Sequence, residues 1–546
     1  MRDKKFNIFI NRKHNRMKSK HILLLILLFS SIFLRAQFNK SDIQRLKTDL
    51  TFLASDSLKG RYPGTFEDSV AAVYISNEFT KAGYLPLIGD SPMIPFEFTL
   101  HREVAKNVSL WNKNKIFEKN IHFAVHPSSS TANISARVVK IDRRDLKSDG
   151  NSIKGAIGVV ECPDDSLMFI ITPMAELGLS AIIFYNGDSL NTPSTARVNG
   201  AMIPVIQVTS PVAEEILKGS DNLLNIVAEV NVIKGKTYNV AAVNLKGNGK
   251  PFVLVGAHYD HLGFGGSGSM VRGVTQIHNG ADDNASGVAA VLESARLLKN
   301  NSRVVVVSAF GAEERGLIGS RILADTLSAL GLLPNLMVNM DMVGRLNDEK
   351  LQIGGVGTFK GADSIVRHIN TNYNFSITTT ADGYGASDHA SFYRKEVPVL
   401  YLTTGVHREY HTPDDDVDLI NFDGLSKIST FVSHLITNIS DSGFKPNYLK
   451  TEAPTSPGRQ SFKVTLGLIP DFTYEKGDGF RIGVVTEGRA ASRGGLKEGD
   501  IITMMKGKKI GNIYDYMAAL GDLNPGESIV VELLRDGQKI SLTLNL

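Results

Sequence analysis

The chain has 546 residues, which is too long for one ordinary domain and favours three or four folded units. Its hydrophobic content of 42% and charged content of 21% are typical of globular proteins and argue against a disordered or fibrous chain. Residues 1–36 contribute +8 to a formal charge of +4, so the remainder carries −4, and this mildly acidic body gives no reason to expect a nucleic-acid partner.

The first predicted element is an export signal over residues 1–36. A basic stretch precedes the apolar run from Ile22 to Leu34, and Ala36 is a small residue suited to the position before a cut. The run is too short to span a bilayer comfortably, so we expect it to be removed and expect no stable membrane anchor; an N-terminal anchor is the alternative. Export implies a periplasmic or extracellular location. Met17 offers an alternative start that leaves a signal of more usual length.

Residues 37–112 are predicted to form the first part of the main domain. Residues 40–53 and 68–82 have apolar residues at helical spacing, which predicts two helices, with Asp68 as the N-cap of the second. The loop between them, LKGRYPGT, contains Arg61, which could reach the substrate but which we expect to be an ordinary loop residue.

Residues 113–236 differ in composition and residue pattern from the segments on either side. Short β-rich runs are separated by glycine, proline and asparagine, which predicts a small, separate β-rich domain inserted into the main one. The single cysteine, Cys162, lies in one of these runs, AIGVVEC, so no intrachain disulfide is possible and a buried apolar role is expected.

Residues 237–445 are predicted to complete the main domain. Continuous apolar, β-branched runs such as FVLVGA, RVVVVSAF, LMVNMD and VPVLYL alternate with helical segments. This alternation indicates an α/β fold with a mixed, mostly parallel sheet covered by helices on both faces. Residues 446–460 contain three prolines and no periodicity and are predicted to be a linker to a compact β-rich unit over residues 461–546.

Polar side chains follow the predicted strands of the main domain at the points where those strands end. Ligands of open α/β sheets bind beyond the carboxyl ends of the strands, so we expect these side chains to gather at one edge. The residues in question are His258, Asp260, Glu313, Glu314, Asp341 and, further along a loop, His411, together with Asp283 in the turn GADDNASG that opens a helix.

Imidazole nitrogen and carboxylate oxygen are ligands that suit zinc. Five ligands that share one carboxylate fit two ions better than one. With Asp283 as the bridge, His258 and Asp341 are left for one ion, and Glu314 and His411 for the other.

The remaining polar residues receive supporting roles. Glu313 is not needed as a ligand, so it is predicted to be the general base. Asp260 is predicted to hold the second ring nitrogen of His258. Asp282 competes with Asp283 for the bridging position. Four further histidines near the motifs are expected to lie at the surface or behind the ligands: His261, His278, His389 and His407.

Taken together, HYDH, GADDNASG, GAEERGLIGS, NMD, SDHASF and HTPDDD closely resemble the motifs of the di-zinc aminopeptidases of peptidase family M28, clan MH. The resemblance covers residues 237–440 and the segment 40–110. It implies the zinc exopeptidase fold, two zinc ions, and an activity that hydrolyses N-terminal residues from peptide substrates.

The resemblance also implies roles for individual residues. The five residues His258, Asp283, Glu314, Asp341 and His411 match the ligands of the family, with Asp283 bridging, and Glu313 matches the base. Tyr384, in GYGASDH, resembles a tyrosine that helps to hold the substrate carbonyl oxygen in some members, and Asp388 resembles a supporting residue. A cis peptide is common in the family after the bridging aspartate, here between Asp283 and Asn284.

The two flanking domains carry resemblances of their own. Residues 113–236 resemble a protease-associated domain, which implies a cover over the cleft. Residues 461–546 resemble a PDZ domain, in which Leu466, Gly467 and Leu468 match the loop whose backbone N–H groups take a peptide C-terminus. The departure is Pro470, which removes one backbone donor from the adjoining strand.

Other functions stay open at this point. A carboxypeptidase or dipeptidase would use the same di-zinc centre. A glutaminyl cyclase-like enzyme shares the fold but binds one zinc, and the presence of both His258 and His411 argues against it. A catalytically dead, receptor-like binding protein would require lost ligands, and none is lost.

Overall fold

The structure is a computed structural model, and it describes residues 41–546 except 142–152, 163, 197–199, 219–222, 245–250, 267, 272–273, 453–463, 472–473, 475–477 and 512. The predicted export signal lies outside the described residues. Of the helices that are described, none is both long enough and apolar enough to cross a membrane.

A ten-stranded mixed sheet forms the centre of the main domain, with the strands in the order β17-β16-β18-β15-β13-β14-β12-β2-β9 and β1 paired to β12. Strands β14, β13, β15 and β18 are neighbours and run parallel, while β12, β2 and β1 add antiparallel pairs on one side. The prediction of a mixed α/β sheet is confirmed. The strands are β1 (Tyr84–Pro86), β2 (Met93–Val104), β9 (Thr195–Ala196), β12 (Val230–Asn244), β13 (Val253–His258), β14 (Val305–Phe310), β15 (Leu336–Met340), β16 (Lys350–Gly354), β17 (Ser376–Thr379) and β18 (Val399–Thr403).

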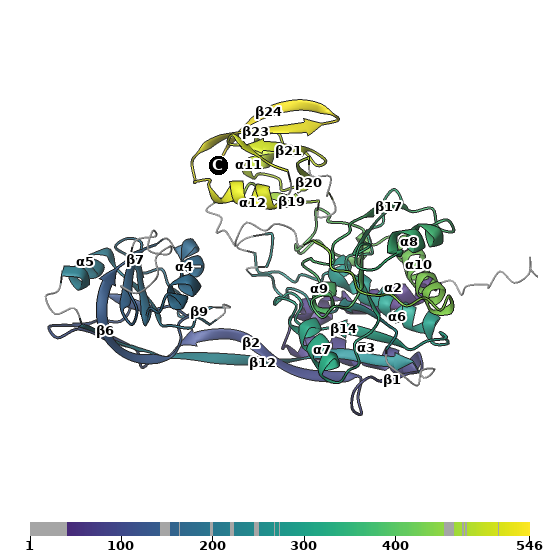
Figure 1. Cartoon of the computed structure of the whole chain (residues 1–546), viewed down its shortest axis with the longest axis horizontal. Helices are drawn as coiled ribbons and strands as arrows, with labels where there is room; N and C mark the ends of the chain where they lie inside the picture. The colour runs from purple at the N-terminus through teal and green to yellow at the C-terminus, as the bar shows by residue number, and fades with distance from the viewer. Residues whose placement is uncertain are drawn as a thin grey trace, which may run out of the picture.

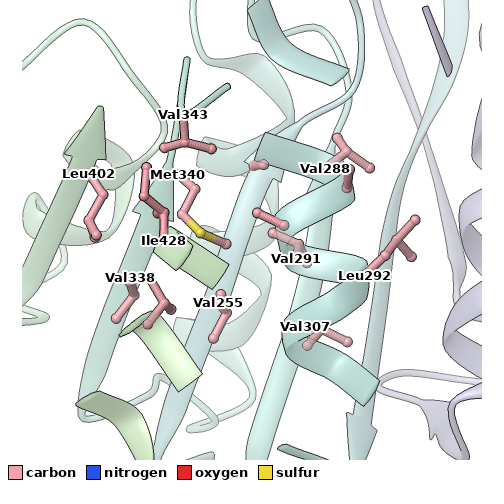
Figure 2. Close-up of a cluster of buried hydrophobic side chains, with 14 of the residues drawn as sticks. Val255, Val288, Val291, Leu292, Val307, Val338, Met340, Val343, Leu402 and Ile428 are labelled. Carbon is pink, nitrogen blue, oxygen red and sulfur yellow. The ribbon is translucent and has the colours of Figure 1, made fainter. Parts of the chain in front are cut away.

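Helices cover both faces of this sheet, because successive side chains of each buried strand point to opposite faces. Val305 and Val307 of β14 join the hydrophobic cluster under α6 and α10, whereas Val306 joins the cluster under α7 and α9. Figure 2 shows the first cluster, in which strand residues such as Val255 gather with residues of α6 and with Ile428 of α10. The helices are α2 (Ile43–Leu53), η1 (Asp56–Arg61), α3 (Phe66–Lys81), η3 (Ala281–Ser286), α6 (Gly287–Leu298), α7 (Ile318–Ala329), α8 (Ala362–Asn370), α9 (His389–Tyr393), η4 (Val417–Leu419) and α10 (Phe422–Asp441).

The second predicted helix begins earlier than expected. Thr65 is the N-cap of α3, because its side chain accepts the backbone N–H of Asp68 at 3.2 Å. Asp68 lies inside the first turn and is buried, where its carboxylate accepts the backbone N–H of Gly64 at 3.0 Å. The prediction that Asp68 caps the helix was therefore wrong by one turn.

The inserted unit stands away from the main domain at the end of an arm made by the long strands β2 and β12 (Figure 1). Its own sheet has the order β4-β3-β11-β6-β7-β8-β10-β5 and is flanked by two helices, so it is less purely β than expected. Cys162 is fully buried in its core. The elements are β3 (Ser109–Trp111), β4 (Ile116–Phe117), β5 (Phe123–Val125), β6 (Ala132–Lys140), β7 (Ile157–Glu161), α4 (Asp164–Glu176), β8 (Ala181–Tyr185), β10 (Val205–Val208), α5 (Ser210–Lys218) and β11 (Leu223–Ala228).

The C-terminal unit has an antiparallel sheet in the order β19-β20-β21-β23-β24, with β22 paired to β21, and a separate hydrophobic core. Its elements are β19 (Leu468–Pro470), β20 (Phe480–Val485), α11 (Ala490–Arg493), β21 (Ile501–Met505), β22 (Lys508–Lys509), α12 (Ile513–Gly521), β23 (Ser528–Arg535) and β24 (Gln538–Asn545).

The start of the predicted linker packs against the main domain. Tyr448 forms an isolated β-bridge with Phe359, and its ring lies 5.3 Å from that of Tyr393. The backbone N–H of Thr451 donates to the Tyr393 hydroxyl at 2.7 Å. Residues 448–451 therefore belong structurally to the main domain, and a free spacer cannot begin before residue 452.

Candidate metal centre

The ends of the parallel strands bring the predicted ligands to one edge of the sheet. His258 is the last residue of β13, Asp341 directly follows β15, and Glu314 lies in the turn after β14. His411 reaches the same edge through the loop after β18, and Asp283 lies in η3 at the start of α6. The strands are fully buried, so the polar residues at their ends are held on a rigid base.

The five side chains form two clusters that share Asp283. In the first cluster, His258 Nε2 lies 3.3 Å from Asp283 Oδ1 and 3.4 Å from Asp341 Oδ1. In the second, His411 Nε2 lies 3.0 Å from Asp283 Oδ2 and 3.3 Å from Glu314 Oε1. Each oxygen of Asp283 thus faces a different histidine, which is the arrangement that a bridging carboxylate requires.

Asp282 lies outside both clusters. Its carboxylate accepts the backbone N–H of Gly344 at 2.6 Å and lies 3.2 Å from His407 Nε2. The peptide bond between Asp283 and Asn284 is cis, as the resemblance implied.

His261 was expected to lie at the surface or behind the ligands, and its side chain is part of the second cluster. It is fully buried, and its Nδ1 lies 2.9 Å from Glu314 Oε1. Its donor atom lies within 4.8 Å of those of Asp283, Glu314 and His411, so four residues could contribute to this cluster. The sequence signal was present in HYDH, where the second histidine follows the strand end as closely as Asp260 does.

The carboxylate of Asp260 was predicted to hold the second ring nitrogen of His258, but it does not contact that ring. His258 Nδ1 faces the backbone carbonyl oxygen of Asp260 at 3.1 Å, which can hold the ring equally well. The carboxylate instead accepts the backbone N–H groups of Glu313 at 2.9 Å and Glu314 at 3.2 Å. Asp260 therefore ties the turn after β14 to the end of β13 and fixes the Glu313–Glu314 pair from behind.

Glu313 has the environment of a proton acceptor. It is 9% exposed, and its Oε2 lies 4.0 Å from His258 Nε2, at the border of the first cluster. Burial, together with the neighbouring carboxylates of Asp388, Glu314 and Asp341, raises the pKa of Glu313 well above its usual range. A raised pKa makes this carboxylate a stronger base than an ordinary glutamate, which suits a general base.

The ligand side chains are themselves held by hydrogen bonds. The Ser387 hydroxyl donates to Asp341 Oδ2 at 2.7 Å, and His411 Nδ1 lies 2.9 Å from the backbone carbonyl oxygen of Gly268. Asp415 Oδ2 accepts the backbone N–H of Asp283 at 3.0 Å. Such contacts orient metal ligands and tune their basicity.

Two segments of the chain match known domain families. Residues 239–436 match the family described as Peptidase family M28, and residues 466–546 match the PDZ domain. The chain therefore contains a peptidase family M28 domain and a C-terminal PDZ domain.

Relatives of the M28 domain include two aminopeptidases. Aminopeptidase YwaD of Bacillus subtilis is 28% identical over 292 residues, which cover 50% of this chain and 60% of that protein. The probable leucine aminopeptidase of Arthroderma otae is 29% identical over 203 residues, which cover 34% of this chain and 53% of that protein. The chain thus spans between about half and 60% of the length of these curated relatives.

Solved structures similar to this chain are less close in sequence. The aminopeptidase from Aneurinibacillus sp. strain AM-1 is 22% identical with a TM-score of 0.47, and the comparison covers 77% of this chain and 98% of that one. BSAP, described as a zinc aminopeptidase from Bacillus subtilis, is 21% identical with a TM-score of 0.46, covering 76% and 98%.

Two tyrosines of the M28 domain, Tyr384 and Tyr410, bear on how a substrate carbonyl oxygen could be held. The ring of Tyr384 packs edge-on against Tyr393 at 5.0 Å, and among the described residues its hydroxyl makes no polar contact with the metal-centre carboxylates. Tyr410, which the sequence reasoning missed, stacks on His411 at 3.9 Å. Burial and the nearby carboxylates of the centre raise the pKa of Tyr410 well above its usual range. Tyr410 therefore lies beside the second cluster, while the role that the resemblance implied for Tyr384 stays a prediction.

Asp388 lies behind the centre of the M28 domain. It is fully buried, and burial raises its pKa to about 7. It contributes to the raised pKa of Glu313, which is consistent with the supporting role that the resemblance implied.

Proposed function

We propose that the M28 domain is a zinc-dependent aminopeptidase that hydrolyses the N-terminal peptide bond of peptide substrates. The observation that carries this proposal is the shared carboxylate of Asp283, whose two oxygens face His258 and His411 at 3.3 and 3.0 Å. The names of the relatives, which include aminopeptidase YwaD and several leucine aminopeptidases, support the choice of reaction.

The residues present fit two zinc ions. His258, Asp283 and Asp341 would hold one, while Asp283, Glu314 and His411 would hold the other, and all are histidine or carboxylate ligands of the kind that zinc takes. Buried carboxylates this close together repel one another unless a cation lies between them. When bound, the two ions supply Lewis-acid polarisation of the substrate carbonyl and lower the pKa of a water molecule.

The chain's own residues then carry the protons. Glu313 accepts a proton from the attacking water on its carboxylate and returns that proton to the nitrogen of the leaving amine as the peptide C–N bond breaks. A tyrosine hydroxyl would donate a hydrogen bond to the carbonyl oxygen as negative charge develops there: that of Tyr384, as the resemblance implied, or that of Tyr410, whose ring stacks on His411 at 3.9 Å. Asp260 keeps Glu313 in position through its backbone N–H.

A free substrate amine would be attracted by the acidic residues of the centre, which favours an aminopeptidase over a carboxypeptidase or dipeptidase. The test is a comparison of hydrolysis rates for short peptides with free and with acetylated N-termini. We expect only the free peptides to be cut, with full loss of activity on chelation and recovery with zinc. Faster cleavage of the acetylated peptides would sink the aminopeptidase assignment while leaving the metal centre in place.

For the PDZ domain we propose that Leu466, Gly467 and Leu468 take the C-terminus of a peptide. In support, β19 is an edge strand of its sheet, so its outer side is open to a further strand. Gly467 has φ +76, a backbone conformation that favours glycine. Titration of the full chain with peptides that carry a free or an amidated C-terminus tests the idea, since only the free carboxylate should bind.

Export to the periplasm or the medium is proposed from the basic and apolar run within residues 1–36. Cell fractionation with and without this segment tests it, and retention of the full-length chain in the cytoplasm would contradict it.

A further inference from the structure

Arg61 is a buried cation beside the metal centre, and the proposed mechanism does not use it. It is the largest of the described side chains that are fully buried, and its backbone has φ 47. Among the described residues no carboxylate forms an ion pair with it. A buried charge is costly unless its donors are satisfied, so its hydrogen bonds decide what it does.

All four hydrogen bonds of the guanidinium go to backbone carbonyl oxygens. Nε donates to Tyr259 at 2.6 Å, and Nη2 donates to Gly280 at 3.1 Å. Nη1 donates to Asn279 at 2.7 Å and also to Leu53. These acceptors belong to three separate segments, namely the end of α2, the loop after β13 and the turn that leads into η3.

Two of these segments carry candidate ligands. Tyr259 is adjacent to His258, and Gly280 lies in the same turn as Asp283. The backbone carbonyl of Arg61 also accepts the N–H of His261 at 3.3 Å, which ties a third residue of the centre to the same point. The Arg61 side chain therefore bridges the loop after β13 and the turn before η3. The separation of these two segments sets the distance from His258 to Asp283.

The electrostatic setting agrees with this geometry. Burial lowers the pKa of Arg61 to about 10, and the carboxylates of Asp260, Asp283, Asp415 and Glu314 act in the opposite direction, so the group stays cationic at neutral pH. Its charge lies near the acidic centre without direct contact to any carboxylate.

We propose that Arg61 is a positioning residue of the metal centre, which holds the ligand loops at their spacing whether or not zinc is bound. The inference rests on the proposed metal centre. Only arginine suits this task, because its planar fork has five N–H donors that point in different directions. Lysine keeps the charge but offers its three donors from one atom, so it cannot bond all three segments.

The first experiment compares Arg61→Lys with Arg102→Lys in the otherwise intact chain. Arg102 is a matched control, because its guanidinium also bonds only carbonyl oxygens, but it does so from the β2 arm to Pro127 and Ser129 of the inserted unit. Zinc affinity is measured by competition with a chromophoric chelator, alongside Tm. Arg61→Lys should weaken zinc binding by about 10-fold or more, as changes behind metal ligands do, while Arg102→Lys should leave it unchanged. Unchanged zinc affinity with a lowered Tm in Arg61→Lys would reduce the residue to a purely structural role.

A second measurement uses the unaltered protein, in case Arg61→Lys does not fold. Hydrogen exchange is followed with and without zinc at the amides of His261 and Asp283, which donate to the Arg61 carbonyl and to Asp415. We expect both amides to stay protected without zinc, since the frame does not depend on the metal. Rapid exchange on zinc removal would overturn the proposal. A protein that keeps this protection but neither binds zinc nor cuts peptides would instead overturn the proposed function.

Discussion

The two candidate sites of this chain are built on opposite principles. In the M28 domain, the proposed chemistry depends on five buried or half-buried side chains that lie up to 153 residues apart, from His258 to His411, and that meet at the ends of parallel strands. In the PDZ domain, the proposed recognition of a peptide depends on the backbone N–H groups of one short loop beside an edge strand.

This difference decides how each site responds to change. A side-chain site loses its function when one atom is replaced, because each ligand or base has no substitute. A backbone site tolerates many side chains but depends on local conformation, so glycine at a positive φ is its sensitive point.

The largest effect is expected for Glu313→Gln, which removes the proton acceptor but no ligand. It should keep both zinc ions and lower kcat/KM by about 10²–10⁴-fold, the usual scale of a general base. Glu314→Gln should instead lower the zinc content, and Glu396→Gln, at an exposed position, should change neither quantity. Metal analysis measures the zinc content, and steady-state kinetics measures kcat/KM. Loss of zinc from Glu313→Gln would reverse the roles of the pair.

The next effect concerns His261, which contacts Glu314. His261→Leu removes the contact at 2.9 Å and should weaken zinc binding by about 10–100-fold, the range found when partners of metal ligands are replaced. His261→Asn keeps an N–H donor near the same position. Its zinc affinity should therefore lie between those of His261→Leu and the wild type. Zinc competition titrations decide this. If His261→Leu binds zinc as tightly as the wild type, His261 does not contribute to the metal centre.

A smaller effect, confined to the PDZ domain, is expected for Gly467→Ala. Its new Cβ would lie 2.3 Å from the Arg489 Cβ at a φ of +76, so the loop must distort, and peptide binding should fall by about 10-fold, equivalent to about 1.4 kcal/mol. Gly507→Ala is the matched control, since its φ is +74 and no atom lies within 4 Å of the added Cβ. Fluorescence anisotropy with a C-terminal peptide measures binding. Equal losses in both variants would show that strain alone, and not the loop, is responsible.

The smallest effect on catalysis is expected when the PDZ domain is removed after residue 452. Hydrolysis of a small chromogenic substrate should stay within about 2-fold of the full rate, because the two units have separate cores. Removal after residue 445 also deletes Tyr448 and Thr451, which contact Tyr393, and should lower Tm by several degrees through the loss of a hydrogen bond and an aromatic contact. If the longer fragment binds zinc but is inactive, the PDZ domain contributes to the active site.

Much of the architecture could be predicted because its signals are local. The buried strands have continuous apolar runs, and β13, β14, β15 and β18 were all predicted from them. The polar residues at the ends of those strands followed from the rule that parallel strands present their carboxyl ends at one edge. The C-terminal unit was recognisable from its motif. The boundary of α3 was missed because Thr65 and Asp68 are both good capping residues, and only the hydrogen bonds distinguish them.

By itself, the sequence determined which residue types stand after which strands, and hence the predicted metal chemistry; the bridging role proposed for Asp283 came from the family resemblance. Only the tertiary structure decided how the supporting residues are used. It placed His261 in the second cluster, turned the carboxylate of Asp260 toward the backbone of Glu313, packed Tyr384 against Tyr393, and buried Arg61 between two loops. The physical reason is that periodicity and spacing report the position of a residue along an element. The direction of a side chain from a loop depends on donors and acceptors that lie far away in the sequence and meet it only after folding.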